Sequence, residues 1–338
     1  MSHFRDNIRR AMLNYHGPLI GCSVRAEELR NAVQRIACTN LTVMIRGERG
    51  TGKDLVAGEI HRKSNRAGPF VRVNCAGLPD ELVETELFGC EKGAYTGATQ
   101  SRAGKFEQAH QGTIFLDEIG ELTSRAQPKL LHVTETLAVD RVGGQRSIPV
   151  DFRLLVATNR DLEEMVWQGR FREDLYDRLK MDVIRVPPLR ERMDDIPLLA
   201  DYFRDRYANE SKRPVRTIAP QVIDKFQQHL WPGNIRELQN IIRRAVYTCL
   251  TGTIRVDNLP FDFAQRTAGP PVKLGNYHER MQACSRELIV AALTHCHGDR
   301  TKAAGLLGLS RSHFHRLIKT HNLDDDADDN GSRESWLQ

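Results

Sequence analysis

Between residues 41 and 186, short apolar runs alternate with longer amphipathic stretches. The runs are rich in β-branched residues and are followed by polar or turn-forming positions, as expected for buried strands. They are residues 41–45, 70–73, 113–116, 152–157 and 181–186, and the stretches near 53–64, 79–88, 124–137 and 161–168 have helical spacing. This alternation predicts an α/β fold in which helices cover both faces of a parallel sheet.

The pattern changes after Pro187-Pro188, where helical spacing alone continues near 194–209, 219–229 and 234–249. Gly and Pro clusters then indicate a linker, a compact helical module follows, and an acidic run predicts a disordered tail. We therefore expect six parts: a short segment 1–18, an α/β subdomain 19–190, a helical subdomain 191–262, a linker 263–276, a helical domain 277–323 and a tail 324–338.

Composition narrows the class of protein. The 338 residues can form two or three domains, and 49 basic against 44 acidic side chains leave the partners open. Seven cysteines without a CxxC pair indicate reduced thiols rather than a disulfide framework. The N-terminus has no apolar signal core and no apolar run reaches the length of a membrane span. We expect a soluble cytoplasmic protein.

A glycine-rich segment follows the first apolar run and precedes a predicted helix, which is the context of a phosphate-binding P-loop. Backbone N–H groups of such a loop surround phosphates, and its lysine contacts the β and γ oxygens. An ordinary glycine-rich turn is the alternative, which the spacing and context disfavour. The predicted nucleotide contacts are Gly47, Glu48, Arg49, Gly50, Thr51, Gly52, Lys53 and Asp54; at position 54 most P-loops have Ser or Thr.

An apolar strand that ends in two acids lies downstream of this loop. Ile114, Phe115 and Leu116 precede Asp117 and Glu118. On its own, such a strand usually marks only a strand exit. After a P-loop it predicts a Walker B element, in which Asp117 coordinates Mg²⁺ and Glu118 orients the attacking water.

A hexapeptide of small residues with one aromatic lies between these two motifs. It consists of Gly93, Ala94, Tyr95, Thr96, Gly97 and Ala98. The two glycines permit backbone angles closed to other residues and place Tyr95 and Thr96 at the tip. Such a loop lacks groups for phosphate chemistry, so we interpret it as a moving contact surface, with a plain surface hairpin as the alternative.

This hexapeptide closely resembles the GAFTGA loop of bacterial enhancer-binding proteins, the AAA+ ATPases that remodel RNA polymerase carrying sigma-54. Tyr95 replaces the usual phenylalanine, and Cys90 stands where histidine is common. The acid at position 54 agrees with the family. The resemblance extends over about residues 19–323 and implies an AAA+ sheet, a helical lid and a Fis-type helix-turn-helix domain.

The resemblance also implies roles for single residues. Asn74 would hold Glu118 inactive, Asn159 would act as sensor I, and Arg236 would contact the γ-phosphate as sensor II. Arg172 and Arg178 match the segment that presents arginine fingers to a neighbouring subunit, and which of them is the main finger stays open. Isolated surface ion pairs are the alternative for each arginine. Ile20 and Gly21 would lie at the adenine, and the turn 141–144 resembles a companion loop of the hexapeptide.

The C-terminal module has the pattern of a helix-turn-helix. Ala303, Ala304 and Leu307 would pack inward, Gly308 would form the turn and Ser310 would cap the second helix. The module resembles the Fis-type domain, whose preceding helices near 277–296 dimerise; a helical interaction module is the alternative. The outward residues predicted to contact DNA are Arg311, Ser312, His313, His315, Arg316 and Lys319.

Together these features predict a sigma-54-dependent transcriptional activator that binds enhancer DNA and hydrolyses ATP with Mg²⁺ in a ring, expected to be a hexamer. Only about 18 residues precede the ATPase domain, so we expect no receiver domain and regulation by a negative-regulator protein acting in trans, as in the short phage-shock-type activators. One alternative is a DNA-binding regulator of the ordinary polymerase that does not remodel sigma-54. Another is a remodelling ATPase such as a chaperone or chelatase subunit.

Overall fold

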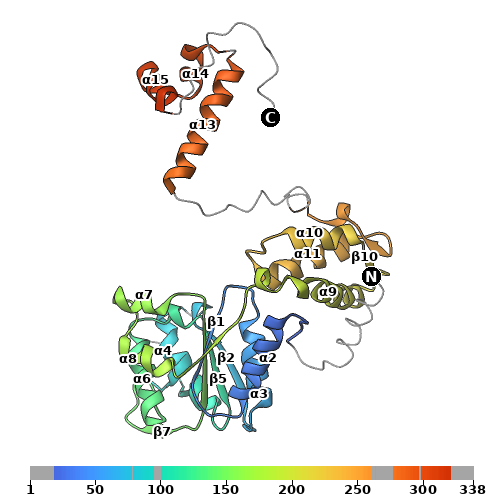
Figure 1. Ribbon diagram of the computed structural model, residues 1–338. Coiled ribbons are helices and arrows are strands. Elements are labelled where there is room, and N and C mark those ends of the chain that lie inside the picture. Colours follow the sequence, from blue (N-terminus) through green and yellow to red (C-terminus); the bar gives the residue numbers. More distant parts are fainter. Residues whose placement is uncertain are drawn as a thin grey trace. The chain divides into compact units, whose positions relative to one another are not determined.

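The predicted strands form one parallel sheet in the computed structural model, in the order β2-β5-β8-β1-β9 (Figure 1). The structure describes residues 19–77, 79–94, 100–260, 263, 277–296 and 298–320. The α/β fold class and the position of every predicted strand are confirmed. The strands are β1 (Val43–Arg46), β2 (Phe70–Asn74), β5 (Thr113–Asp117), β8 (Arg153–Thr158) and β9 (Asp182–Arg185).

Alternate residues of the strands enter two separate hydrophobic cores, one on each face of the sheet. In β5, Ile114 and Leu116 pack with one core whereas Phe115 packs with the other, because successive side chains of a strand point to opposite faces. Figure 1 shows α2 and α3 on one face and α4, α6 and α8 on the other. The helices are α2 (Val24–Ala37), α3 (Lys53–Lys63), α4 (Asp80–Phe88), α5 (Lys105–Gln108), α6 (Ala126–Thr136), α7 (Leu162–Trp167) and α8 (Glu173–Leu179).

A buried arginine joins the sheet to the end of α2. Arg153, in β8, is 1% exposed and donates hydrogen bonds to the carbonyls of Ile36 (2.7 Å) and Ala37 (3.0 Å). These carbonyls lie in the last turn of the helix, where a cation is favourable. Burial lowers the pKa of this guanidinium to about 10.

The α/β unit also contains two short antiparallel hairpins, which the apolar pattern did not predict. They are β3 (Gly89–Cys90) with β4 (Arg102–Ala103), and β6 (Ala138–Asp140) with β7 (Ser147–Pro149). In the first hairpin, strand β3 precedes the hexapeptide and strand β4 follows it. The second hairpin contains the glycine-rich turn 141–144.

A mostly helical subdomain, which we call the lid, follows β9. Its core surrounds Trp231, which is fully buried, packs against Phe226 and Phe263, and donates Nε1–H to Phe226 O (2.8 Å). The three predicted helices are present, but the expectation of helices alone missed a short parallel strand pair. The lid contains α9 (Ile196–Ser211), α10 (Pro220–Gln228), α11 (Asn234–Thr248), β10 (Thr217–Ile218) and β11 (Thr253–Ile254).

Single 3-10 turns connect several of these elements. They are η1 (Cys75–Gly77), η2 (Ile119–Glu121), η3 (Leu189–Glu191), η4 (Met193–Asp195) and η5 (Val256–Asn258). Two of them, η3 and η4, lead from the sheet into α9 of the lid.

The C-terminal unit is a separate helical body with its own small core. It consists of α13 (Tyr277–His295), α14 (Arg300–Leu306) and α15 (Arg311–Thr320). Gly308 has a φ of +64° in the turn, and the hydroxyl of Ser310 accepts from His313 N (3.3 Å) at the start of α15. Phe314 and Ile318 are fully buried. Among the residues that the structure describes, no helix is both long and apolar enough to cross a membrane.

Candidate functional site

The P-loop connects the end of β1 to the first turn of α3. Gly50 and Gly52 have φ values of +77° and +93°, a region that favours glycine. A Cβ on Gly50 would also lie 2.3 Å from the carbonyl oxygen of Gly233. Lys53 donates its ammonium hydrogens to the carbonyls of Gly47 (3.0 Å) and Glu48 (3.4 Å) within the loop. The loop, helix start and lysine together fit a phosphate group.

The two acids of the predicted Walker B element lie at the carboxyl end of β5, opposite this lysine. Glu118 Oε1 is 3.7 Å from Lys53 Nζ, and Glu118 has a left-handed backbone with φ of +52°. Burial, together with the negative charge of Glu118, raises the pKa of Asp117. A divalent cation would offset this repulsion, and carboxylates are the ligands that Mg²⁺ prefers. Asp117 therefore fits a metal-bound nucleotide, while Asp54 is exposed in the first turn of α3.

Asn159, rather than Asn74, contacts Glu118. With the carboxamide oxygen of Asn159 facing Arg49 Nε (3.0 Å), its NH₂ group donates to Glu118 Oε2 (2.6 Å). Asn74 pairs with Asp117 in the β2–β5 register, but its side-chain oxygen accepts from Ala76 N (3.1 Å). The role of Asn74 in holding the glutamate stays a prediction.

The lid contacts the P-loop through polar residues that the sequence pattern did not reveal. Asn234 is fully buried and donates to Glu48 Oε2 and to the carbonyl of Arg49, both at 3.1 Å. Arg190 makes a two-pronged ion pair with Glu48 (2.6 and 2.8 Å). These hydrogen bonds from Arg190 and Asn234 lower the pKa of Glu48 to about 2, so this carboxylate stays charged and holds the lid to the loop.

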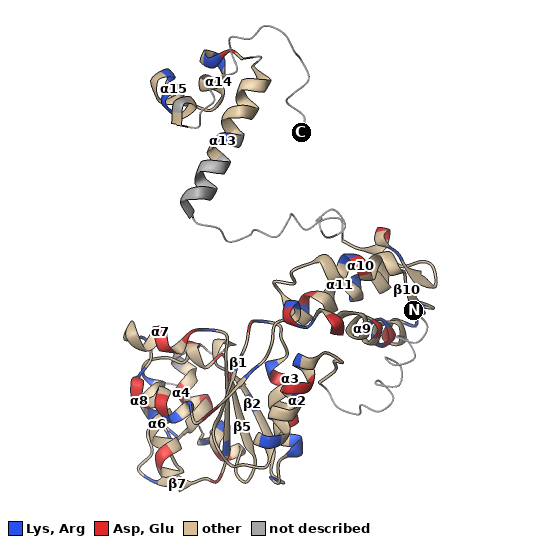
Figure 2. Cartoon of the chain, in the orientation of Figure 1, with Lys and Arg blue, Asp and Glu red and all other residues tan. Residues whose placement is uncertain are grey.

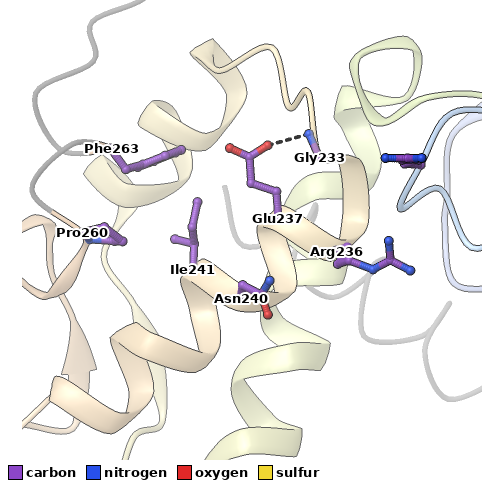
Figure 3. A pocket seen from close by; sticks show the side chains of 8 residues that line it. Gly233, Arg236, Glu237, Asn240, Ile241, Pro260 and Phe263 are labelled. Atoms are coloured by element: carbon purple, nitrogen blue, oxygen red, sulfur yellow. Dashed lines mark hydrogen bonds between the residues drawn. The ribbon is translucent and has the colours of Figure 1, made fainter. Parts of the chain in front are cut away.

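Arg236 lies in the first turn of α11, next to the P-loop. Its backbone N–H donates to the carbonyl of Gly50 (3.3 Å), and its side chain is exposed. Figure 3 shows its guanidinium on the opposite side of the site from Pro260 and Phe263. Together with Arg49 it contributes positive charge to a cavity of about 430 Å³, which Glu237 and apolar lid side chains also line.

The segment predicted to contact adenine is anchored to the lid by a buried aspartate. Asp195 is fully buried and accepts hydrogen bonds from Cys22 N (2.6 Å), Ser23 N (2.7 Å) and Ser23 Oγ (2.8 Å). A Cβ on Gly21 would lie 2.7 Å from Asp195 Oδ2, and Ile20 packs against the lid core. Ile20 and Gly21 therefore lie where the lid meets the α/β subdomain.

Arg192, which the sequence interpretation also missed, lies buried between Asp195 and the P-loop. Its guanidinium donates to the carbonyl of Thr51 (3.4 Å), and burial lowers its pKa. The available signal was a charged cluster at 190–195, between the last predicted strand and the first predicted helix of the lid.

The two candidate finger arginines lie on the surface and make hydrogen bonds outside the P-loop. Arg172 makes two hydrogen bonds with the carboxylate of Asp174 (3.0 and 2.7 Å) at the start of α8. Arg178 donates to the carbonyl of Thr134 (2.8 Å). Both side chains are exposed. Within the described part of the chain, neither forms a hydrogen bond or ion pair with Lys53 or Glu118.

The second hairpin holds the base of the hexapeptide loop. Arg141 pairs with Glu107 (2.7 Å) and Glu91 (3.0 Å), and Val142 exchanges backbone hydrogen bonds with residues 89 and 91. A Cβ on Gly143 would lie 2.8 Å from Ala94 Cβ. Gly93 has a φ of +86°. The remaining hexapeptide residues, Tyr95, Thr96, Gly97 and Ala98, lie outside the described residues.

Most of the predicted DNA contacts lie on the outer face of α15. Arg311, Ser312, His313 and Arg316 are exposed and His315 is half-buried, whereas the side chain of Lys319 lies outside the described residues. Figure 2 shows Lys and Arg positions, in blue, on α14 and α15. An exposed basic helix after a tight turn has the form of a recognition helix.

Three family models match consecutive parts of the chain. Residues 19–185 match a Sigma-54 interaction domain, residues 190–274 an AAA+ ATPase lid domain, and residues 283–319 a bacterial regulatory protein of the Fis family.

Curated relatives and a solved structure agree with these models. VnfA of Azotobacter vinelandii is 46% identical over 90% of this chain and 59% of its own length. AtoC of Escherichia coli is 42% identical over 86% and 64%, and NtrC of a Bradyrhizobium species is 40% identical over 89% and 69%. The chain thus spans less than two thirds of the first two relatives.

Among solved structures, NtrX of Brucella abortus is 33% identical, with a TM-score of 0.68 over 94% of this chain and 71% of NtrX. NtrX has also been crystallised with ADP and with ATP. On this evidence the chain belongs to the family of sigma-54-interacting AAA+ regulators with a Fis-type helix-turn-helix domain.

Proposed function

We propose that this protein hydrolyses ATP to activate transcription by sigma-54 RNA polymerase from enhancer DNA. One observation carries the proposal: the groups suited to ATP chemistry converge at one edge of the sheet, and the base of the hexapeptide loop is fixed to the same subdomain. The groups suited to ATP chemistry are Lys53, Asp117, Glu118 and Asn159. The base of the hexapeptide loop is held by Arg141 and its two glutamate partners.

The chemistry follows from charge and position. Backbone N–H groups of the P-loop surround the phosphates while Lys53 exchanges its loop carbonyls for phosphate oxygens. Asp117 would hold Mg²⁺, which would supply positive charge to those oxygens. Glu118 orients the attacking water and Arg236 reaches the γ-phosphate from the lid.

We propose a ring on account of the two candidate finger arginines. Since Arg172 and Arg178 are exposed and make the hydrogen bonds given above outside the P-loop of their own chain, we propose that they act on the ATP of a neighbouring subunit. A closed ring, for which we propose six subunits, gives every site a finger. Regulation by a separate negative-regulator protein is part of the same proposal.

The C-terminal unit is the part of the chain that we propose binds the enhancer DNA. We propose that α15 enters the major groove and that the helix before the helix-turn-helix pairs two copies on an enhancer. Arg311 and Arg316 are exposed on α15 and would contact phosphates or base edges.

The test is ATP-dependent open-complex formation by sigma-54 polymerase on a supercoiled promoter with its enhancer. Thr96→Ala should retain ATP binding and much of the hydrolysis but lose activation, because the hexapeptide has no group suited to phosphate chemistry. Thr248→Ala, the same substitution on the lid surface, is the matched control. A Thr96 variant that traps sigma-54 with a transition-state analogue of ATP and opens promoters normally would refute the coupling role of the loop.

A further inference from the structure

The carboxamide of Asn159 lies between two groups of opposite charge. In the orientation that satisfies both neighbours, its oxygen accepts from Arg49 Nε at 3.0 Å and its nitrogen donates to Glu118 Oε2 at 2.6 Å. The reverse orientation would place oxygen against carboxylate and NH₂ against guanidinium, both unfavourable. Arg49 and Glu118 therefore decide together which way this carboxamide faces.

The backbone from which the Arg49 side chain extends is fixed by the lid. The carbonyl of Arg49 accepts from Asn234 Nδ2 (3.1 Å), and the next carbonyl, that of Gly50, accepts from Arg236 N (3.3 Å). Although the side chain of Arg49 is exposed, these two hydrogen bonds hold the backbone at and next to this residue. A guanidinium anchored in this way can hold a partner in one orientation.

We propose that Arg49 is a positioning residue that keeps the NH₂ group of Asn159 turned toward Glu118. The proposal rests on the ATPase role of Glu118 given above. The ammonium of Lys53 lies 3.7 Å from Glu118. When this ammonium pairs with phosphate instead, Asn159 remains as the hydrogen-bond donor that holds the carboxylate. Loss of Arg49 weakens the preference for this orientation, because only Glu118 then favours it, so Glu118 is placed less often where it can orient water.

The first experiment measures turnover and nucleotide affinity in the full chain. Arg49→Ala should lower kcat about tenfold, the effect of one lost positioning hydrogen bond, with KM and the affinity for a fluorescent ATP analogue unchanged within about twofold. Arg49→Lys should recover most of kcat, since an ammonium can donate to the same oxygen. Arg25→Ala, which removes an exposed arginine paired with Glu28 on α2, is the matched control and should match the wild type.

A double variant separates this role from direct phosphate binding. Arg49→Ala in an Asn159→Ala background should cause no further loss, because the middle group of the link is already missing. Additive losses, or a loss confined to nucleotide affinity, would overturn the proposal.

A second measurement does not need turnover. In the nucleotide-free chain labelled with ¹⁵N-asparagine, the side-chain amide signals of Asn159 are identified by their absence in Asn159→Ala. They should shift in Arg49→Ala, return toward the wild-type position in Arg49→Lys and stay in place in Arg25→Ala. Signals that do not move in Arg49→Ala would refute the link. Signals that move as expected, together with a wild-type chain that hydrolyses no ATP, would refute the proposed ATPase alone.

Discussion

Two side chains that form an ion pair in the structure are proposed to do different work. Lys53 lies 3.7 Å from Glu118, yet the first belongs to the phosphate cradle and the second to water activation. Lys53→Ala should therefore prevent nucleotide binding. Glu118→Gln should preserve binding and lower hydrolysis by about 10² or more, the usual contribution of a positioned general base.

Titration with a fluorescent ATP analogue and phosphate release measured on the same two preparations test this separation. Wild-type turnover in the Glu118→Gln variant would remove that residue from its role. Equal nucleotide affinity in Lys53→Ala and wild type would do the same for the lysine.

At the residue scale, motifs confined to a few consecutive positions were predictable and isolated contacts were not. The glycine spacing located Lys53, and the apolar run located Asp117. Asn234 and Arg190 could not be connected with Glu48, because each is a single polar residue more than 140 positions away along the chain. The direction of the Asn74 side chain depends on a turn at Ala76, which no periodicity encodes.

At the element scale, the length of an apolar run decided what could be predicted. Strands such as β5 and β8 have enough buried positions to stand out. Strands β3 and β4 have two residues each, too few for alternation to appear. The helix-turn-helix was predictable because Gly308 and Ser310 mark its turn and its cap.

The same C-terminal element carries a prediction of its own. Deletion of residues 277–338 should abolish specific DNA binding and leave ATP hydrolysis intact, because the exposed basic helix α15 lies there. In the full chain, Arg316→Ala should weaken binding and reduce its salt dependence, since phosphate contacts release counterions. Mobility shifts on an enhancer fragment at several salt concentrations measure both. Unchanged affinity of the truncated chain would place the DNA site elsewhere.

At the scale of the whole molecule, the three family matches confirm the predicted family. The Fis-family match over residues 283–319 speaks against a chaperone or chelatase subunit, which would need no DNA-binding domain. Charge composition could not have revealed this, because the basic residues of α15 are offset by acids elsewhere in the chain. Regulation by a protein in trans stays a prediction.

Assembly should be visible in the kinetics. ATP turnover per subunit should rise with protein concentration, and Arg172→Ala or Arg178→Ala should lower it by roughly 10³–10⁵ if that arginine is the finger. Mixing the affected variant with Lys53→Ala should restore part of the activity, because a subunit without a functional P-loop can still supply its finger to a neighbour. Turnover that is independent of concentration and not restored by mixing would indicate a self-contained site.

The buried carboxylate of Asp195 has a consequence for protein engineering. It binds the backbone of residues 22 and 23 from a position at the entrance to the lid, so two segments far apart in the sequence form one structural part. A chimaera that received only the lid helices of a relative would divide that part between two parents. Exchange of lids among members of this family should therefore include residues 19–23 from the same donor, so that the segment predicted to contact adenine and the lid are transplanted together.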